Sequence, residues 1–510
     1  MLCPIWDFRF NYGVKANDQD GFSPRDGDAD LGKLGWLAAA TDYYDRPDWT
    51  YIHTAGREGT QPTGGSASAM FPWGGQAIFR NHYAADPDRL WMWMDVGPYG
   101  TSGHAHCSKN AVNIRASGAM LLVDSGRFQY NGRGLSEQLN RLYERTTTAH
   151  NTLTFDGRQQ ATAPAAAAGP VASSSWHFAA DADFVRGVSV EYAGLLGAVV
   201  HQRGTLYVKA SSAGLPPYIV VVDRVSTDRS RTVQASWHAH PRANVTLHGN
   251  GRAATIVGVS TATGEPASAM LTLFPSSQGP TDTTAFAWDD ANIVRGQVGN
   301  DSAGVPWQGW YSSTYNGNAT APTLVFDGVV PKAGAVFGWL MIPQQLASSG
   351  MPAASLSVTL PDSDGSVTAT VTVGGRDEAV VLQLGPAPAP PPTPAPCLPG
   401  TFRICGACRP VALACPNGTS LDVVLLSGDD GSCNCEEYCA TDWNGQLKTQ
   451  RPQWSGATSL FGNSTAPVGC DPPICACVQA THWCTRIEHE CKLGCGSTGV
   501  PAPRDFCRRV

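Results

Sequence analysis

Short runs of apolar and polar residues, many of them alternating, follow one another through most of the chain between residues 75 and 385. Most runs are rich in β-branched or aromatic residues and are bounded by Gly, Pro, Asn or Asp, which is the pattern of short strands separated by turns. Inside this region only residues 135–145 have the apolar spacing of a helix. The pattern therefore predicts a mainly β protein with one large antiparallel β-sandwich over residues 75–385. The expected strands are 76–80, 89–96, 119–124, 151–155, 199–208, 218–225, 232–240, 267–274, 324–326, 336–342, 355–360, 366–373 and 378–384.

The two ends of the chain differ from this region. Within residues 1–74, the segment 30–44 has apolar residues at helical spacing, and we expect it to be part of a helical domain whose beginning is absent. Seven of the twelve residues 385–396 are proline, so 386–396 should form an extended linker. The linker separates the sandwich from a third region, residues 397–510.

Cysteine usage sets this third region apart, because fourteen of the sixteen cysteines lie between Cys397 and Cys507. Such density is typical of a small disulfide-rich domain in an oxidising compartment. Spacings such as Cys405-x2-Cys408 could instead bind zinc, but the even count and the proline-rich linker favour disulfides. Secretion would agree with the sequons at Asn244, Asn300, Asn318, Asn417 and Asn463. Residues 1–10 lack the pattern of a signal peptide, which indicates that the front of the protein is missing.

Charge and hydropathy exclude several classes of function. The formal net charge is −7, whereas a general nucleic-acid-binding protein should present a basic face. No segment approaches the roughly 18 uninterrupted apolar residues of a membrane span. The sequence also lacks the GxSxG, P-loop and HExxH motifs, so nothing supports a hydrolase-elbow, nucleotide-binding or zincin function.

Two histidines and a carboxylate that suit a metal ion come from one part of the predicted sandwich. His104 and His106 are two residues apart, so on a strand they would share a face. Asp124 ends the next apolar run, and His150 opens the strand after it. Two imidazoles and a carboxylate from three adjacent strands would hold zinc and leave a fourth position for water.

An isolated His-x-His pair is more often a pair of surface or core histidines than a metal site. The chain contains a second pair, His238 and His240, with no nearby acidic residue and a proline directly after it. We interpret that pair as part of an ordinary strand, and it serves as an internal comparison for the first.

Several separated motifs between residues 71 and 160 resemble, in the right order, the C-terminal domain of the heparinase II/III-like polysaccharide lyases. The resemblance covers this stretch, fades after about residue 240, and does not include the linker or the cysteine-rich region. Residues 10–21 weakly resemble the segment that closes the helical domain of that family. The matching motifs are FPWGGQAIFR (71–80), RLWMWMDVGPYG (89–100), SGHAH (102–106), AMLLVDSGRFQYN (119–131) and TTTAHNTLTFDG (146–157).

This resemblance implies roles for individual residues. His106, Asp124 and His150 would be the ligands of one structural zinc ion, and His104 would be a catalytic histidine that faces the sugar. Substrate-binding groups would be Arg127, Tyr130, Tyr143 and Arg145, although a solvated or packed side chain is an equal alternative for each of these four.

The family also pairs its sandwich with an N-terminal α/α toroid, which supplies the catalytic tyrosine, a histidine and an asparagine. Residues 1–74 are too few to hold that toroid, so they would be a remnant of it and the connector to the sandwich. Either this is a partial chain, or the protein has lost the catalytic half.

Two functional hypotheses follow. The first is a secreted polysaccharide lyase that cleaves a uronic-acid-containing polysaccharide by β-elimination. Its partner would be an acidic polysaccharide, and residues 76–160 carry eight Arg and one Lys against seven Asp or Glu, a local charge of +2. The alternative is a non-catalytic extracellular carbohydrate-binding or matrix protein built on the same sandwich.

Overall fold

The computed structural model describes most of the chain between residues 67 and 386, together with short pieces on either side. Helix α3 (Pro47–His53) precedes this part. The expected helix over 30–44 and the disulfides expected in 397–510 fall outside the described residues. The described residues are Asp45, 47–53, 58–60, 67–82, 90–97, 106–126, 128–129, 135–160, 170–190, Tyr192, Leu195, 197–249, 251–260, 266–276, 286–298, 306–312, 316–346 and 351–386, with four short strands between 401 and 421.

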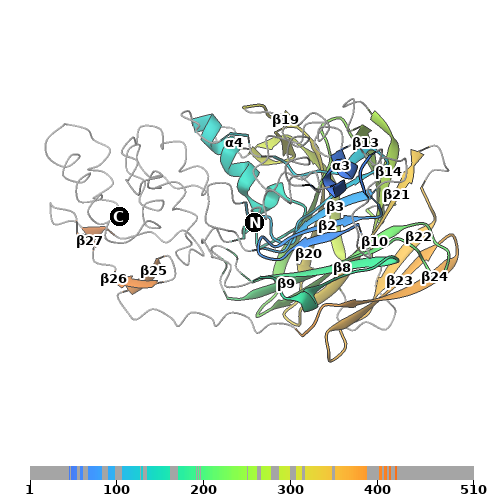
Figure 1. Cartoon of the computed structure of the whole chain (residues 1–510). Coiled ribbons are helices and arrows are strands. Elements are labelled where there is room, and N and C mark those ends of the chain that lie inside the picture. Colours follow the sequence, from blue (N-terminus) through green and yellow to red (C-terminus); the bar gives the residue numbers. More distant parts are fainter. Residues whose placement is uncertain are drawn as a thin grey trace.

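A 13-stranded antiparallel sheet forms the centre of the structure (Figure 1). Its strand order is β1-β2-β3-β4-β5-β13-β14-β21-β10-β9-β8-β7, and β12 pairs with β13 outside this path. The strands are β1 (Ala69–Phe71), β2 (Gln76–Arg80), β3 (Leu90–Asp95), β4 (Val112–Ala116), β5 (Ala119–Leu122), β7 (Trp176–Phe178), β8 (Ala182–Ser189), β9 (Val199–Val208), β10 (Tyr218–Thr227), β12 (Asn244–His248), β13 (Ala253–Ser260), β14 (Pro266–Pro275) and β21 (Ala335–Gln345).

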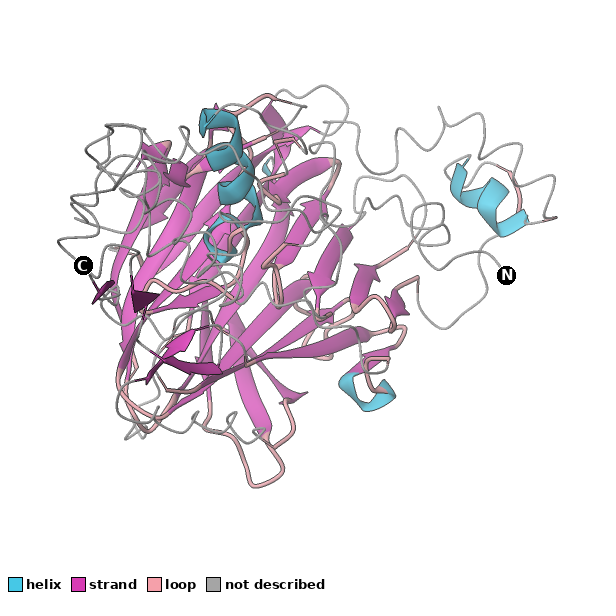
Figure 2. Cartoon of the chain, turned by 90° about the vertical axis from the view of Figure 1, so that its left-hand side faces the viewer, coloured by secondary structure: helices cyan, strands magenta, loops and turns pink. Residues whose placement is uncertain are grey.

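Smaller sheets and few helices complete the described part (Figure 2). A four-stranded sheet has the order β15-β20-β11-β6, with β6 (Leu153–Phe155), β11 (Arg231–His238), β15 (Trp288–Arg295) and β20 (Pro322–Val330). Two-stranded ribbons pair β16 (Gln297–Val298) with β17 (Pro306–Gln308), β18 (Trp310–Tyr311) with β19 (Ala319–Thr320), β25 (Thr401–Ile404) with β26 (Ala407–Pro410) and β27 (Leu413–Ala414) with β28 (Ser420–Leu421). The three-stranded sheet is β22 (Ala354–Val358), β23 (Ser366–Val373) and β24 (Arg376–Gln383), and the helices are α4 (Leu135–Arg145), η2 (Thr147–Ala149) and η3 (Ser173–Ser175).

Both faces of the large sheet are covered, which explains the nearly continuous apolar runs in its central strands. In β10, Ile219 and Val221 join the core cluster that also holds residues of the four-stranded sheet. The alternate residues Val220 and Val222 join a second cluster with residues of β22–β24. Because successive side chains of a strand point to opposite faces, β10 lies between two apolar layers. The sandwich therefore consists of the four-stranded and 13-stranded sheets, with the three-stranded sheet as an outer layer.

A buried carboxylate, Glu378 of β24, fastens the outer layer to the large sheet. Its Oε1 accepts hydrogen bonds from the backbone N–H (2.8 Å) and the hydroxyl (2.7 Å) of Ser212, and its Oε2 accepts one from Tyr218 Oη (2.8 Å). Burial by itself raises the pKa of Glu378, but hydrogen bonding with Ser211, Ser212 and Tyr218 more than offsets it and lowers the pKa to about 2.

We expect Glu378→Gln to lower the free energy of unfolding by about 1–2 kcal/mol at pH 7, since charge-assisted hydrogen bonds become neutral ones. The folded-state pKa lies below the unfolded value of about 4.3, so the contribution is full above that pH and is lost as the pH falls towards 2. Urea denaturation of both proteins at pH 7 and near pH 3 measures this.

The matched control for this substitution is Asp377→Asn, the preceding residue. Asp377 is exposed, and its carboxylate accepts a hydrogen bond from Thr372 Oγ1 (2.7 Å) at the surface. We expect a change below about 0.5 kcal/mol. Equal losses from the two substitutions would contradict the anchoring role of Glu378.

The prediction of a mainly β, antiparallel sandwich is confirmed. The strands expected at 76–80, 199–208 and 366–373 and the helix expected at 135–145 have the same bounds in the structure. Among the described residues, no helix is both long and apolar enough to span a membrane. The proposed domain boundaries at 74, 385 and 396 remain predictions.

Candidate metal centre

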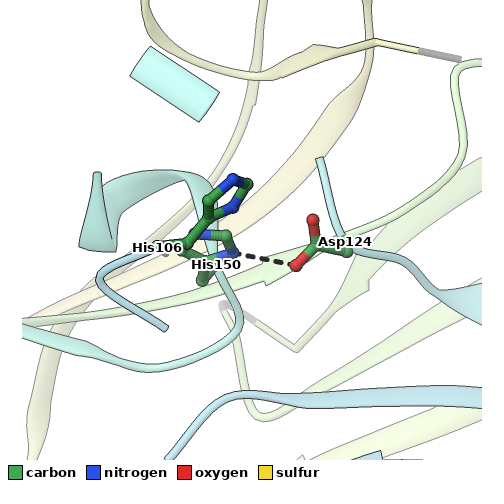
Figure 3. Close-up of side chains that lie close together, drawn as sticks. All are labelled: His106, Asp124 and His150. Carbon is green, nitrogen blue, oxygen red and sulfur yellow. Dashed lines mark hydrogen bonds and ion pairs between the residues drawn. The ribbon is translucent and has the colours of Figure 1, made fainter. Parts of the chain in front are cut away.

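Three side chains gather where the large and the four-stranded sheets meet (Figure 3). His106 lies in the loop before β4, Asp124 lies two residues after β5, and His150 follows the short helix η2 and precedes β6. The expectation of three adjacent strands is therefore corrected: the residues lie beside strands of two different sheets. His106 is not on a strand, so the strand argument that gave His104 and His106 one face does not apply.

The three side chains lie close enough to share a cation. One ligand atom from each residue lies within 4.8 Å of the other two, and all three residues are buried. The rings of His106 and His150 have centroids 5.3 Å apart, and His150 Nδ1 lies 2.9 Å from Asp124 Oδ2 (Figure 3). Sequence positions 106, 124 and 150 thus form one cluster, as expected.

Backbone contacts hold the loops that carry these residues. The N–H of Cys107 donates to the carbonyl of Arg145 (2.9 Å), which ties the His106 loop to the end of α4. After Asp124, the N–H of Gly126 donates to Asp124 Oδ1 (3.0 Å). Gly126 has a φ of 97°, and a Cβ there would lie 2.3 Å from the carbonyl oxygen of Ser312. Only glycine fits this turn, which fixes the direction of the Asp124 carboxylate.

The electrostatics of the cluster favour a bound cation. Burial by itself raises the pKa of Asp124, but His150, His106 and the Gly126 N–H more than offset it and hold the pKa below its usual range. His150 Nε2 is buried and has no hydrogen-bond partner among the described residues. A buried ring nitrogen without a partner lowers the stability of the fold. A metal ion would bind the lone pair of this nitrogen and remove that penalty.

Asp124 can serve such a cation in two ways that involve the same three residues. One is direct ligation through a carboxylate oxygen. The other keeps the observed contact with His150 Nδ1, which orients the ring so that Nε2 points to the metal. Two nitrogens and one carboxylate form a donor set that zinc accepts.

Asn151, the residue after His150, joins the cluster to both sheets. Its Nδ2 donates to the Val112 carbonyl (2.8 Å), Asn113 Oδ1 (3.0 Å) and the Val123 carbonyl (3.0 Å). Its Oδ1 accepts a hydrogen bond from the His238 N–H (2.6 Å) and lies 3.0 Å from His238 Nδ1. The amide therefore fixes the backbone beside His150 from β4, β5 and β11 together.

A fully buried ion pair, Arg203 with Asp223, holds the backbone at Asn151. Arg203 Nη1 donates to the carbonyls of Asn110 (2.7 Å) and Asn151 (2.8 Å). Arg203 Nε donates to Asp223 Oδ1 (2.7 Å), and His201 Nε2 lies 2.7 Å from the same oxygen. Burial raises the pKa of Asp223, but Arg203 and His201 outweigh it and hold that pKa well below its usual range. The carboxylate is thus charged and balances the guanidinium.

His238 was interpreted from the sequence as part of an ordinary strand, and it does end strand β11. The structure adds that it contacts the residue next to a candidate ligand and faces Gln308 Oε1 with its Nε2, 3.3 Å away. Burial is the largest cause that lowers the pKa of His238, to about 4, so the ring is neutral at pH 7. It supports the candidate centre and is not one of the three clustered groups.

The other sequence-predicted site residues divide into two groups. His104, Arg127 and Tyr130 lie outside the described residues. Tyr143 and Arg145 lie on α4, where Tyr143 is buried and donates a hydrogen bond from Oη to Gln308 Oε1 (3.2 Å). Arg145 is half-buried at the end of the helix. Contact of any of these residues with substrate remains a prediction.

No sequence pattern assigned Asn151, Arg203 or Gln308 to the site. Asn151 directly follows the candidate ligand His150 in the sequence, and this position could have indicated a supporting role. Arg203 and Gln308 lie on strands far away in the sequence, and only the folded arrangement brings them to the cluster.

The fold and the buried His–Asp–His cluster together define an antiparallel β-sandwich domain with a candidate metal site. Comparison with known proteins identifies its family. The profile of the heparinase II/III-like C-terminal domain matches residues 63–340, more than half of the chain. The chain therefore belongs to the heparinase II/III-like family. No curated protein sequence matches at a significant level.

Solved structures of similar fold include several lyases. Heparan sulfate lyase HepC from Pedobacter heparinus is 17% identical, with a TM-score of 0.54 over 70% of this chain and 49% of that one. A heparinase III gene product is 18% identical, with a TM-score of 0.55 over 70% of this chain and 48% of that one. Another heparinase III is 15% identical, with a TM-score of 0.53, and the alignment covers 74% of this chain and 52% of that one. The chain thus spans about half the length of these proteins, and at this identity the likeness shows the shared fold.

Proposed function

We propose that this protein takes part in the cleavage of a uronic-acid-containing polysaccharide by β-elimination, as a secreted polysaccharide lyase. The observation that carries the proposal is the buried cluster of His106, Asp124 and His150 inside a domain of the heparinase II/III-like family. The printed names of the similar structures, heparan sulfate lyase and heparinase III, agree with an acidic polysaccharide as substrate.

The cluster would hold one zinc ion with a structural role. The ion would supply positive charge that fixes the loops before β4 and after β5, and the first of these carries His106, two residues after His104 in the sequence. Asp124 contributes the compensating negative charge, since its pKa is lowered and it is ionised at neutral pH. The neutral His238 and the Asn151 amide hold the backbone around His150 without adding charge.

The reaction itself needs groups on both sides of the sugar ring. A base removes the C5 proton, the C5–H electron pair forms the C4–C5 double bond, and the C4–O bond breaks. An acid then gives a proton to the departing oxygen. Because negative charge builds on the uronate carboxyl group, donors must lie against it, as in an oxyanion hole. In this domain, His104 would be the donor that lies against the uronate carboxyl group. Candidate contacts to the rest of the sugar are Arg127, Tyr130, Tyr143 and Arg145.

The local charge supports an anionic substrate. Residues 76–160 carry a net +2 within a chain of net −7, so the region around the cluster has the sign that attracts a polyuronate.

A binding and turnover experiment tests the proposal. Residues 1–510, and the same chain joined to a helical domain of the family, are mixed with alginate, heparan sulfate and glucuronan, with a neutral glucan as control. We expect both proteins to bind an acidic polymer and only the second to form the unsaturated uronate, detected by its ultraviolet absorbance. Binding without turnover by either protein would favour the non-catalytic carbohydrate-binding alternative. Absence of binding to every acidic polymer would refute both.

A further inference from the structure

The short ribbon of β16 and β17 is anchored directly beside the candidate metal centre. Gln308 of β17 is buried, and its Oε1 accepts the hydrogen bond from Tyr143 Oη (3.2 Å) and faces His238 Nε2 (3.3 Å). Its Nε2 donates to Ser236 Oγ (2.9 Å). Since His238 contacts Asn151, two contacts link the ribbon to the residue that follows the candidate ligand His150. One side chain thus fixes the ribbon to α4 and to β11.

Backbone packing holds the ribbon on its other side. The N–H of Gly296 donates to the carbonyl of Gly309 (2.8 Å), and a Cβ on Gly309 would lie 2.8 Å from Arg295 Cα. Gly309 has a φ of 78°, so both its conformation and this close approach require glycine. Trp310 Nε1 donates to the carbonyl of Gln297 (2.8 Å). These contacts fix the base of the ribbon, although the ribbon pairs with neither main sheet.

Trp307 lies on β17 of this ribbon, and half of its surface is exposed to water. It precedes the buried Gln308, and strand alternation puts the two side chains on opposite faces. Trp307 is 50% exposed, and Val298 on the neighbouring strand is 44% exposed. A large apolar side chain gains its stabilisation from burial, so this exposure does not serve the fold. Large exposed aromatic groups near a site are typical of binding surfaces.

A cationic side chain lies at the base of the ribbon. Arg295 ends β15 directly before Gly296, and its exposed guanidinium donates from Nη1 to the carbonyls of Pro241 (3.0 Å) and Thr320 (3.3 Å). Asp289 and Asp290 lie near the opposite end of β15, five or six residues away, which corresponds to roughly 17–20 Å of strand. The charged side chain of β15 nearest to the ribbon is therefore positive.

We propose that Trp307 is a stacking platform for a pyranose ring of an acidic polysaccharide, with Arg295 as the neighbouring contact for its carboxylate or sulfate group. One face of a pyranose consists of C–H bonds, which are slightly positive and apolar, and the face of an indole is negative and apolar. Because the Gln308 side chain holds the backbone that carries Trp307, this backbone loses little conformational entropy when the sugar binds. This inference rests on the proposed function, because it gives the same substrate class a second point of contact.

The test compares two substitutions of Trp307 in the full chain, with a tetrasaccharide of alginate and one of heparan sulfate as probes. We expect Trp307→Ala to weaken binding of the preferred tetrasaccharide about 2- to 12-fold by calorimetry, and Trp307→Phe to retain most of the affinity. Arg295→Gln should weaken the binding of the acidic tetrasaccharide and leave any binding of neutral cellotetraose unchanged. Val381→Ala, an exposed apolar position on β24 of the outer layer, is the control and should have no effect.

Each outcome distinguishes this inference from the proposed function. If the unaltered chain binds an acidic tetrasaccharide and Trp307→Ala binds it equally well, the platform is refuted while the proposed function stands. If Trp307→Phe loses as much as Trp307→Ala while both melt at the temperature of the unaltered chain, aromatic stacking is refuted. If the unaltered chain binds neither acidic probe, the proposed function and the platform both fail.

Discussion

Replacing His106, Asp124 or His150 by alanine should remove the bound zinc from the purified protein and destabilise the sandwich. Each substitution leaves two of three clustered donors in a buried site, where His150 Nε2 already has no hydrogen-bond partner in the described structure. We expect about one zinc per chain in the unaltered protein and nearly none in the variants. The free energy of unfolding should fall by about 1–3 kcal/mol, because the remaining polar groups stay buried without partners. Metal analysis and urea denaturation measure the two effects.

Two histidines outside the cluster provide matched controls. His238→Ala should retain zinc, since both ring nitrogens face amide oxygens, but should lose stability through Asn151 and Gln308. His248→Ala, on β12 and hydrogen-bonded to Thr255 Oγ1 (3.0 Å), should change neither zinc content nor stability by much. Equal zinc loss from His238→Ala and His106→Ala would show that the wrong histidine was assigned to the metal.

Strands with clear alternation or with β-branched and aromatic residues at both ends could be predicted from the sequence. β23 alternates Thr with Val or Ala, and β9 begins with Val199 and Val200 and ends with Tyr207 and Val208, so both were predicted with correct bounds. β8 also alternates buried and half-buried residues, yet its sequence ADFVRGVS contains Asp183, Arg186 and Gly187, which are uncommon in strands. Asp183 is tolerated because Lys209 Nζ lies 2.8 Å from its carboxylate in the folded protein. Such tertiary compensation is not visible in a local pattern.

The membership of the candidate centre could be predicted, and its surroundings could not. His106, Asp124 and His150 lie within 44 residues of one another in the sequence, and family motifs mark their positions. The side chains packed around Asn151, the residue after His150, include His238 and Gln308, which are about 90 and 160 residues after His150. A local pattern also placed all three ligands on strands. They lie in the turns beside strands, where loops have the freedom to direct side chains.

His104 is the position where substitution should change catalysis most. It lies two residues before His106, and the family resemblance turns it towards the sugar and away from the metal. In a protein that joins this chain to a helical domain of the family, we expect His104→Ala to retain zinc and melting temperature and to lose about 10²–10⁴-fold in turnover. The absorbance of the unsaturated uronate measures this loss. A variant that loses zinc together with activity would contradict a role separate from the metal.

Residues 1–510 by themselves should show little or no turnover on any uronic-acid polymer, because the family resemblance assigns the catalytic tyrosine to the helical domain. Robust elimination by this chain would mean that a tyrosine of the sandwich region, Tyr130 or Tyr143, acts as the base. Burial, and then the nearby Glu144, raises the pKa of Tyr143 far above its usual range, so its tyrosinate form is even rarer at neutral pH than for an exposed tyrosine. Its hydroxyl also donates to Gln308 and is buried. In that event Tyr143→Phe should leave turnover nearly intact, and Tyr130→Phe should abolish it.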